Sequence, residues 1–123
     1  MAADVVVYKS PTCGCCKKWV SHMRENGFSV EVHEQYNVTP VKDKYAVPRK
    51  LRSCHTAKVG DYVVEGHVPA DVVRQLLETK PDIAGVAVPG MPMGSPGMEG
   101  HRKDAYDIIS FDGNGKTKVF ASR

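Results

Sequence analysis

Three of the four cysteines of the chain lie in one short segment, Cys13-Gly14-Cys15-Cys16. Cys13 and Cys16 have the two-residue spacing of a redox-active cysteine pair, and an apolar helical pattern begins directly at Cys16. The amides and partial positive charge at a helix N-terminus lower the pKa of a thiol and favour the thiolate near neutral pH. Because a thiolate is both a nucleophile and a metal ligand, the segment is a candidate for thiol exchange by Cys13 and Cys16, and for metal binding.

Cys15 favours metal binding over simple exchange. A third thiol beside Cys16 would expose an exchange enzyme to wrong pairing and overoxidation. A single structural zinc fits poorly, because its ligands are usually separated by about two to four residues. Thiolates that bridge more than one metal ion fit better. With Cys54 and His55 from a distant segment the chain offers four sulfurs and an imidazole, a soft ligand set that points to copper(I) above zinc or iron.

A second concentration of sulfur lies in segment 81–104, which holds Met91, Met93 and Met98 among five glycines and four prolines. This composition predicts a long loop without helix or strand. A thioether stays unprotonated and forms no disulfides, so the three methionines could hold copper(I) even in an oxidising compartment. His67, fixed between Gly66 and Pro69, is a further candidate near the site. The plainer alternatives are a structural disulfide, a buried Cys54 thiol and methionines that only pack.

Hydrophobic periodicity predicts the elements that position these residues. In the first half we expect a strand over Val5–Tyr8, a helix with the apolar stripe Cys16, Trp19, Val20 and Met23, a strand over Phe28–Val32, and a helix over Val41–Ala46 capped by Thr39. In the second half we expect a strand near Cys54, a strand over Tyr62–Val64, a helix with the stripe Val72, Val73, Leu76 and Leu77, and a C-terminal hairpin of Tyr106–Phe111 and Lys118–Phe120.

This order predicts one α/β domain over residues 1–123. The net charge is only +3, with no basic run longer than Lys17-Lys18, which argues against a nucleic-acid groove. No apolar stretch approaches the roughly 18 residues that a membrane span requires. The N-terminal residues do not form a signal peptide, so we expect either a cytosolic protein or the mature form of an exported one.

Four segments carry a family resemblance: Tyr8–Trp19, Ser53–Ala57, Glu65–Asp71 and Val88–Glu99. In this order they closely resemble the CopG-like proteins of bacterial copper-resistance operons, over residues 5 to about 120. The resemblance implies a thioredoxin-like fold, with a mixed central sheet flanked by helices, and a periplasmic location after signal cleavage. It also implies copper as the ligand. Other copper-resistance or efflux proteins are candidate partners.

Carried over by position, the resemblance implies copper ligands at Cys13, Cys15, Cys16 and Cys54. His55, His67, Met91, Met93 and Met98 match its other motif positions. The leading hypothesis is a protein that binds several copper(I) ions through bridging thiolates and could interconvert copper(I) and copper(II) as an oxidoreductase. One alternative is a thiol-disulfide oxidoreductase with Cys13 as nucleophile and Cys16 as resolving thiol. Another is a copper chaperone that delivers copper to an efflux system.

Overall fold

The computed structural model describes residues 4–90, 92–100 and 103–123. Its elements follow one another in the order of a mixed α/β fold, which confirms the predicted fold class. They are β1 (Val5–Lys9), α1 (Gly14–Glu25), β2 (Val30–Glu34), α2 (Thr39–Lys44), the 3-10 helix η1 (Arg49–Leu51), β3 (Thr56–Val59), β4 (Tyr62–Gly66), α3 (Ala70–Thr79), β5 (Gly85–Val88), β6 (Asp107–Phe111) and β7 (Thr117–Ser122).

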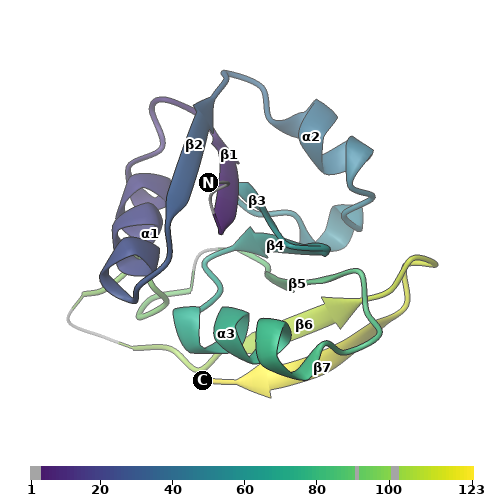
Figure 1. Cartoon of the computed structure of the whole chain (residues 1–123). Helices are drawn as coiled ribbons and strands as arrows, with labels where there is room; N and C mark the ends of the chain where they lie inside the picture. The colour runs from purple at the N-terminus through teal and green to yellow at the C-terminus, as the bar shows by residue number, and fades with distance from the viewer. Residues whose placement is uncertain (1–3, 91, 101–102) are drawn as a thin grey trace.

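The strands form one seven-stranded sheet in the order β2-β1-β3-β4-β5-β6-β7 (Figure 1). The β1–β2 and β4–β5 pairs are parallel, and the other neighbours are antiparallel. The predicted C-terminal hairpin is confirmed as β6 and β7. The sheet is therefore mixed, while the thioredoxin-like arrangement itself stays a prediction.

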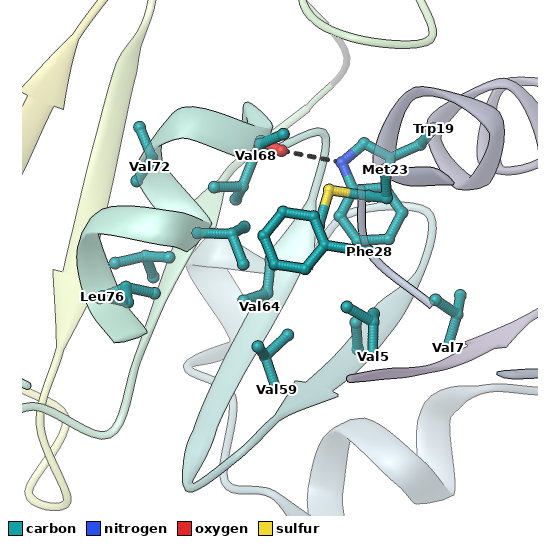
Figure 2. Close-up of a cluster of buried hydrophobic side chains, with 14 of the residues drawn as sticks. Val5, Val7, Trp19, Met23, Phe28, Val59, Val64, Val68, Val72 and Leu76 are labelled. Carbon is teal, nitrogen blue, oxygen red and sulfur yellow. Dashed lines mark hydrogen bonds between the residues drawn. The ribbon is translucent and has the colours of Figure 1, made fainter. Parts of the chain in front are cut away.

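Helices α1 and α3 cover one face of the sheet and form its main apolar core (Figure 2). Trp19, Val20 and Met23 of α1 point into this core, as their helical spacing predicts. The side chains that they meet come from α3 and from alternate positions of the strands: Val5, Val7, Ala57, Val59, Val64, Val72, Val73, Leu76, Val86, Val88 and Ile108. The indole of Trp19 also donates to the carbonyl oxygen of Val68 at 2.9 Å.

A smaller apolar cluster lies on the opposite face of the sheet. It contains Val63, Ala87 and Phe111 from the strands, with Val47 and Leu51 from the segment between α2 and β3. Val63 and Val64 therefore belong to different clusters, as successive residues of a strand should. The sheet is covered on both faces, and α2 lies on the side away from α1 and α3 (Figure 1).

Two local expectations are wrong, and a third is right only in part. Segment 81–104 is not wholly irregular, because Gly85–Val88 forms β5, a short, fully buried strand between β4 and β6. Thr39 does not cap α2 but is its first helical residue, and its amide donates to the side-chain oxygen of Asn37 at 3.1 Å. The strand expected near Cys54 is β3, which begins two residues later at Thr56, so Cys54 itself lies in a bend.

Helices α1, α2 and α3 have 12, 6 and 10 residues. In the part of the chain that the structure describes, none has the length and apolarity needed to span a bilayer. The same residues contain only trans peptide bonds, including the one between Val47 and Pro48.

Candidate metal centre

The topology of the sheet brings the ligand-bearing segments to one edge. Tyr8 of β1 pairs with Thr56 of β3, and Thr56 pairs with Glu65 of β4. Because β3 is antiparallel to both neighbours, the end of β1, the start of β3 and the end of β4 lie in one row. The cysteine turn follows β1, Cys54 and His55 precede β3, and His67 follows β4.

The cysteine turn begins α1. Cys13 is the N-cap residue, and the amide of Cys16 donates to its Sγ at 3.4 Å. Cys13 and Cys16 are joined by a disulfide, whereas Cys15 and Cys54 lie outside it. Cys16 is buried at the inner side of the helix, and Cys13 and Cys15 are half-buried. The turn therefore presents sulfur both inward and toward the edge of the sheet.

All four cysteine sulfurs form one cluster, with every Sγ within 4.8 Å of the others. The Sγ of Cys15 lies 3.5 Å from that of Cys13 and 3.8 Å from that of Cys54. Two sulfurs that bind one metal ion at about 2.3 Å each lie roughly 3.3 to 4.6 Å apart. The spacing therefore fits sulfurs that share metal ions.

Cys54 also belongs to a second set of ligand atoms, with His55 and His67. Its Sγ lies 3.3 Å from Nδ1 of His55 and 3.2 Å from Nε2 of His67. The other ring nitrogen of His67, Nδ1, lies 3.3 Å from the hydroxyl of the buried Ser95. Cys54 is thus common to an all-sulfur set and to a mixed sulfur and nitrogen set.

Burial determines the protonation of this centre. It lowers the pKa of His55 well below its usual value. It also lowers the pKa of His67, and both shifts favour the neutral imidazole, which is the form that binds metal. Burial, followed by the charge of Cys15, raises the pKa of Cys54 to about 12. A metal ion that binds Cys54 must therefore displace its proton.

His55 has a nitrogen that hydrogen bonds do not satisfy. Among the buried side-chain nitrogen and oxygen atoms of the described residues, only Nε2 of His55 has no hydrogen-bond partner. The Trp19 ring packs against the imidazole, with the centroids 4.4 Å apart. A buried polar atom without a partner is unfavourable. The nitrogen that faces the Cys54 sulfur is the other one, Nδ1, and the donor set of Cys54 Sγ, His55 Nδ1 and His67 Nε2 beside the other cysteine sulfurs has the soft chemistry that fits copper.

The loop that holds Met93 and Met98, called the methionine loop below, follows β5 and packs against the same centre. Gly97 has a φ of +102°, and a Cβ atom there would lie 2.7 Å from the carbonyl oxygen of Cys15. Met93 and Met98 are half-buried on this loop. Met91 lies outside the described residues. The loop therefore contacts the cysteine turn, while thioether ligation stays a prediction.

Sequence reasoning missed the charged residues behind the centre. Glu65 and Lys42 are both buried and form an ion pair of 2.6 Å. The carboxylate of Glu65 also accepts from the amide of Ser53, the residue before Cys54. The sequence gives one indication of this pair, because Glu65 lies inside the apolar strand Tyr62–Gly66, and a charge that is buried there requires partners.

The comparisons with known proteins agree with this geometry. A family model described as "Protein of unknown function, DUF411" matches residues 51–98, which include Cys54, His55 and His67. No curated protein sequence matches the chain.

Two solved structures match nearly the whole chain. The one titled "Copper resistance protein copG- Form 2" is 42% identical with a TM-score of 0.93, and the match covers 100% of this chain and 99% of that chain. The one titled "Copper resistance protein copG- Form 1" is 43% identical with a TM-score of 0.91, and covers 97% and 95%. At this identity and coverage, the protein belongs to the CopG family of copper resistance proteins.

Proposed function

We propose that the protein binds several copper(I) ions in one cluster, which is bridged by the thiolates of the four cysteines and completed by the imidazoles of His55 and His67. The observation that carries this proposal is the position of Cys54, whose sulfur belongs both to the four-sulfur cluster and to the Cys54, His55 and His67 set. A thiolate between two ligand sets is suited to bridge ions. Soft thiolates with imidazoles favour copper(I).

The proposed setting is copper resistance in the periplasm. The solved relatives are titled copper resistance proteins. A loop with Met93 and Met98 beside the centre supports the same setting, because thioethers keep their affinity for copper(I) where thiols oxidise. We propose the methionines, including Met91, as entry ligands that receive the ion before the thiolates do.

The cysteine pair also gives the protein a route to change the oxidation state of copper. Two copper(II) ions accept one electron each as the Cys13 and Cys16 thiols form their disulfide bond and release two protons to solvent. The products are two copper(I) ions, for which Cys15, Cys54 and the imidazoles remain as ligands. The reverse reaction oxidises two copper(I) ions and reduces the disulfide. The disulfide between Cys13 and Cys16 supports this step, because it is the oxidised state that the reaction requires.

An anaerobic copper(I) titration of the fully reduced protein against a chromogenic competitor tests the binding proposal. We expect at least two tightly bound ions per chain. Cys54→Ser should lose more than one ion, because its sulfur serves both ligand sets, whereas Met23→Leu, which removes a sulfur from the apolar core, should bind like the wild type. One ion or none in the wild type would contradict the cluster.

The redox step has its own test. Copper(II) added anaerobically to the reduced protein should lose its paramagnetic signal, with one thiol consumed per ion and two ions reduced per chain by Cys13 and Cys16. Cys13→Ser should abolish the fast phase of this signal loss, which is the phase that the Cys13 and Cys16 pair supplies. An unchanged copper(II) signal in the wild type would exclude the reduction while leaving copper(I) binding intact.

A second function is favoured by the disulfide at the start of α1, which is also the arrangement of a thiol-disulfide oxidoreductase. That function predicts disulfide reductase activity without copper, and little dependence on Cys15 or Cys54. A Cys15→Ser, Cys54→Ser double variant decides between the two. Retained reductase activity would favour thiol exchange, and a protein without activity and without copper would favour the cluster.

A further inference from the structure

The segment that carries Cys54 and His55 has no regular secondary structure of its own. Cys54 lies in a bend, and His55 is the residue before β3 begins. Both residues are nevertheless held close to other ligands, with Cys54 Sγ 3.8 Å from Cys15 Sγ. Some other set of bonds must therefore fix this segment.

The carboxylate of Glu65 supplies these bonds on both sides of the Cys54-His55 pair. Its Oε2 accepts from the amide of Ser53 at 2.8 Å. Its Oε1 accepts from the hydroxyl of Thr56 at 2.6 Å. Ser53 precedes Cys54 and Thr56 follows His55, so one buried side chain holds both ends of the ligand-bearing dipeptide.

The two residues after Glu65 also contact the segment that carries Cys54 and His55. The amide of Gly66 donates to the carbonyl oxygen of His55 at 3.0 Å. The ring of His67 then lies 3.2 Å from the Cys54 sulfur. Residues 65–67 thus bind residues 53–56 through a side chain, a backbone amide and a ring in turn.

Lys42 of α2 completes the arrangement and binds the same carboxylate oxygen as the Ser53 amide. Its Nζ lies 2.6 Å from Oε2 of Glu65 and 3.0 Å from Oγ1 of Thr56. Lys42 is 5% exposed and Glu65 is fully buried. A buried ion pair is weak support for stability, since desolvation of the two charges offsets much of their attraction. Charge-assisted hydrogen bonds to a fixed carboxylate do, however, restrict the geometry of their donors.

We infer that Glu65 is a positioning residue, whose carboxylate holds Ser53 and Thr56 and thereby places the Cys54 thiol within bridging distance of Cys15. Its relevance to copper rests on the proposed function. Its effect on the two thiols does not, because it can be measured without metal.

The metal-free test measures how readily Cys15 and Cys54 form a disulfide in a Cys13→Ser, Cys16→Ser protein at equilibrium with glutathione. Ser53→Pro removes the amide that donates to Glu65, and Arg52 has the extended backbone (ψ 139°) that a following proline requires. Ser53→Ala is the matched control, since both variants lose the hydroxyl but only the proline loses the amide. We expect Ser53→Pro to lower the effective concentration of the two thiols toward each other, for disulfide formation, by about tenfold relative to Ser53→Ala. A misplacement of reacting groups by about 1 Å can lower a rate by about a hundredfold.

Glu65→Gln completes a double-mutant cycle. It should also lower the effective concentration, and Ser53→Pro should have little further effect in its presence if both act through one contact. Additive effects would overturn the inference, as would a Ser53→Pro protein that matches Ser53→Ala. Thermal unfolding of each variant identifies any that fail to fold. If Glu65→Gln fails in this way, the Ser53 pair still decides.

Copper titration of the same single variants in the otherwise wild-type chain separates the two proposals. If the wild type binds several ions and Ser53→Pro binds fewer than Ser53→Ala, both stand. If the wild type binds none but the thiol equilibrium responds, the cluster fails and the positioning role stands. If the wild type binds several ions and Ser53→Pro shows no change in either assay, the positioning role fails and the cluster stands.

Discussion

The core under α1 and α3 and the sheet edge that carries the candidate metal centre are held together by different kinds of interaction. The core is apolar, and apart from Phe28 and Val68 its side chains come from regular helices and strands. The edge contains buried polar residues, His55, Glu65, His67 and Ser95, of which His55, His67 and Ser95 lie in bends or loops. Packing is sufficient to hold the first region, whereas the second depends on specific hydrogen bonds between segments far apart in the chain.

This difference predicts that stability and copper binding can be changed separately. Apolar burial is non-directional and contributes in proportion to area. Ligand geometry is directional, and small displacements matter more than buried area. Substitutions in the two regions should therefore have different signatures.

The largest effect on stability is expected in the core. Leu76→Ala removes a fully buried side chain and should lower the free energy of unfolding by about 2 to 5 kcal/mol. Urea denaturation measures the loss, and the adjacent Leu77→Ala, at a position 37% exposed, is the matched control with a smaller effect. The folded Leu76→Ala protein should still bind the wild-type number of copper ions. Loss of ions would show that the two regions are coupled.

An intermediate effect is expected where the methionine loop meets the cysteine turn. Gly97→Ala combines a positive φ with a Cβ only 2.7 Å from the Cys15 carbonyl oxygen, and should cost about 1 to 3 kcal/mol. Gly90→Ala has a positive φ of +74° but no atom within 4 Å, so it isolates the backbone strain. Thermal unfolding and copper titration should both show a larger loss for Gly97→Ala. Equal losses would mean that the contact with Cys15 has no role.

The smallest effect on stability is expected at Cys15. Cys15→Ser should change the free energy of unfolding by no more than about 0.5 kcal/mol, because the side chain is half-buried and outside the core. It should nevertheless reduce the copper(I) stoichiometry by at least one ion, with the Cys13–Cys16 disulfide still able to form. A variant that binds copper like the wild type would contradict the bridged cluster.

The same contrast explains how much could be predicted from the sequence. The stripes of α1 and α3 follow a strong period, so those helices were predicted with their inward faces, although Leu77, which was expected in the α3 stripe, is exposed. β5 was missed because it is a short strand of four residues that are all buried, so it lacks the alternation of apolar and polar residues that identifies a strand. The helix cap at Thr39 was wrong because α2 already begins at Thr39, and the first amides of the helix, those of Val41 and Lys42, donate to the carbonyl oxygen of Val38.

For the candidate centre, residue chemistry indicated which side chains could bind metal but not how they meet. The four cysteines, His55 and His67 were identified from their types, their spacing and the family resemblance. Their convergence depends on the antiparallel placement of β3 between β1 and β4, which no local pattern encodes. Lys42 and Glu65 were missed because a single charge in a helix or strand resembles a solvated one until its partner is known.

The Cys13–Cys16 disulfide joins residues only three positions apart. The entropy that a crosslink removes from the unfolded chain grows with the length of the loop it closes, so this bond contributes about 2 kcal/mol, against about 4.7 kcal/mol for a loop of 100 residues. The folded state therefore loses little when the bond is reduced, and the apolar core remains to hold it together. The electron exchange proposed at this bond would therefore require no cycle of unfolding and refolding, so that redox chemistry and conformational stability would be separate properties.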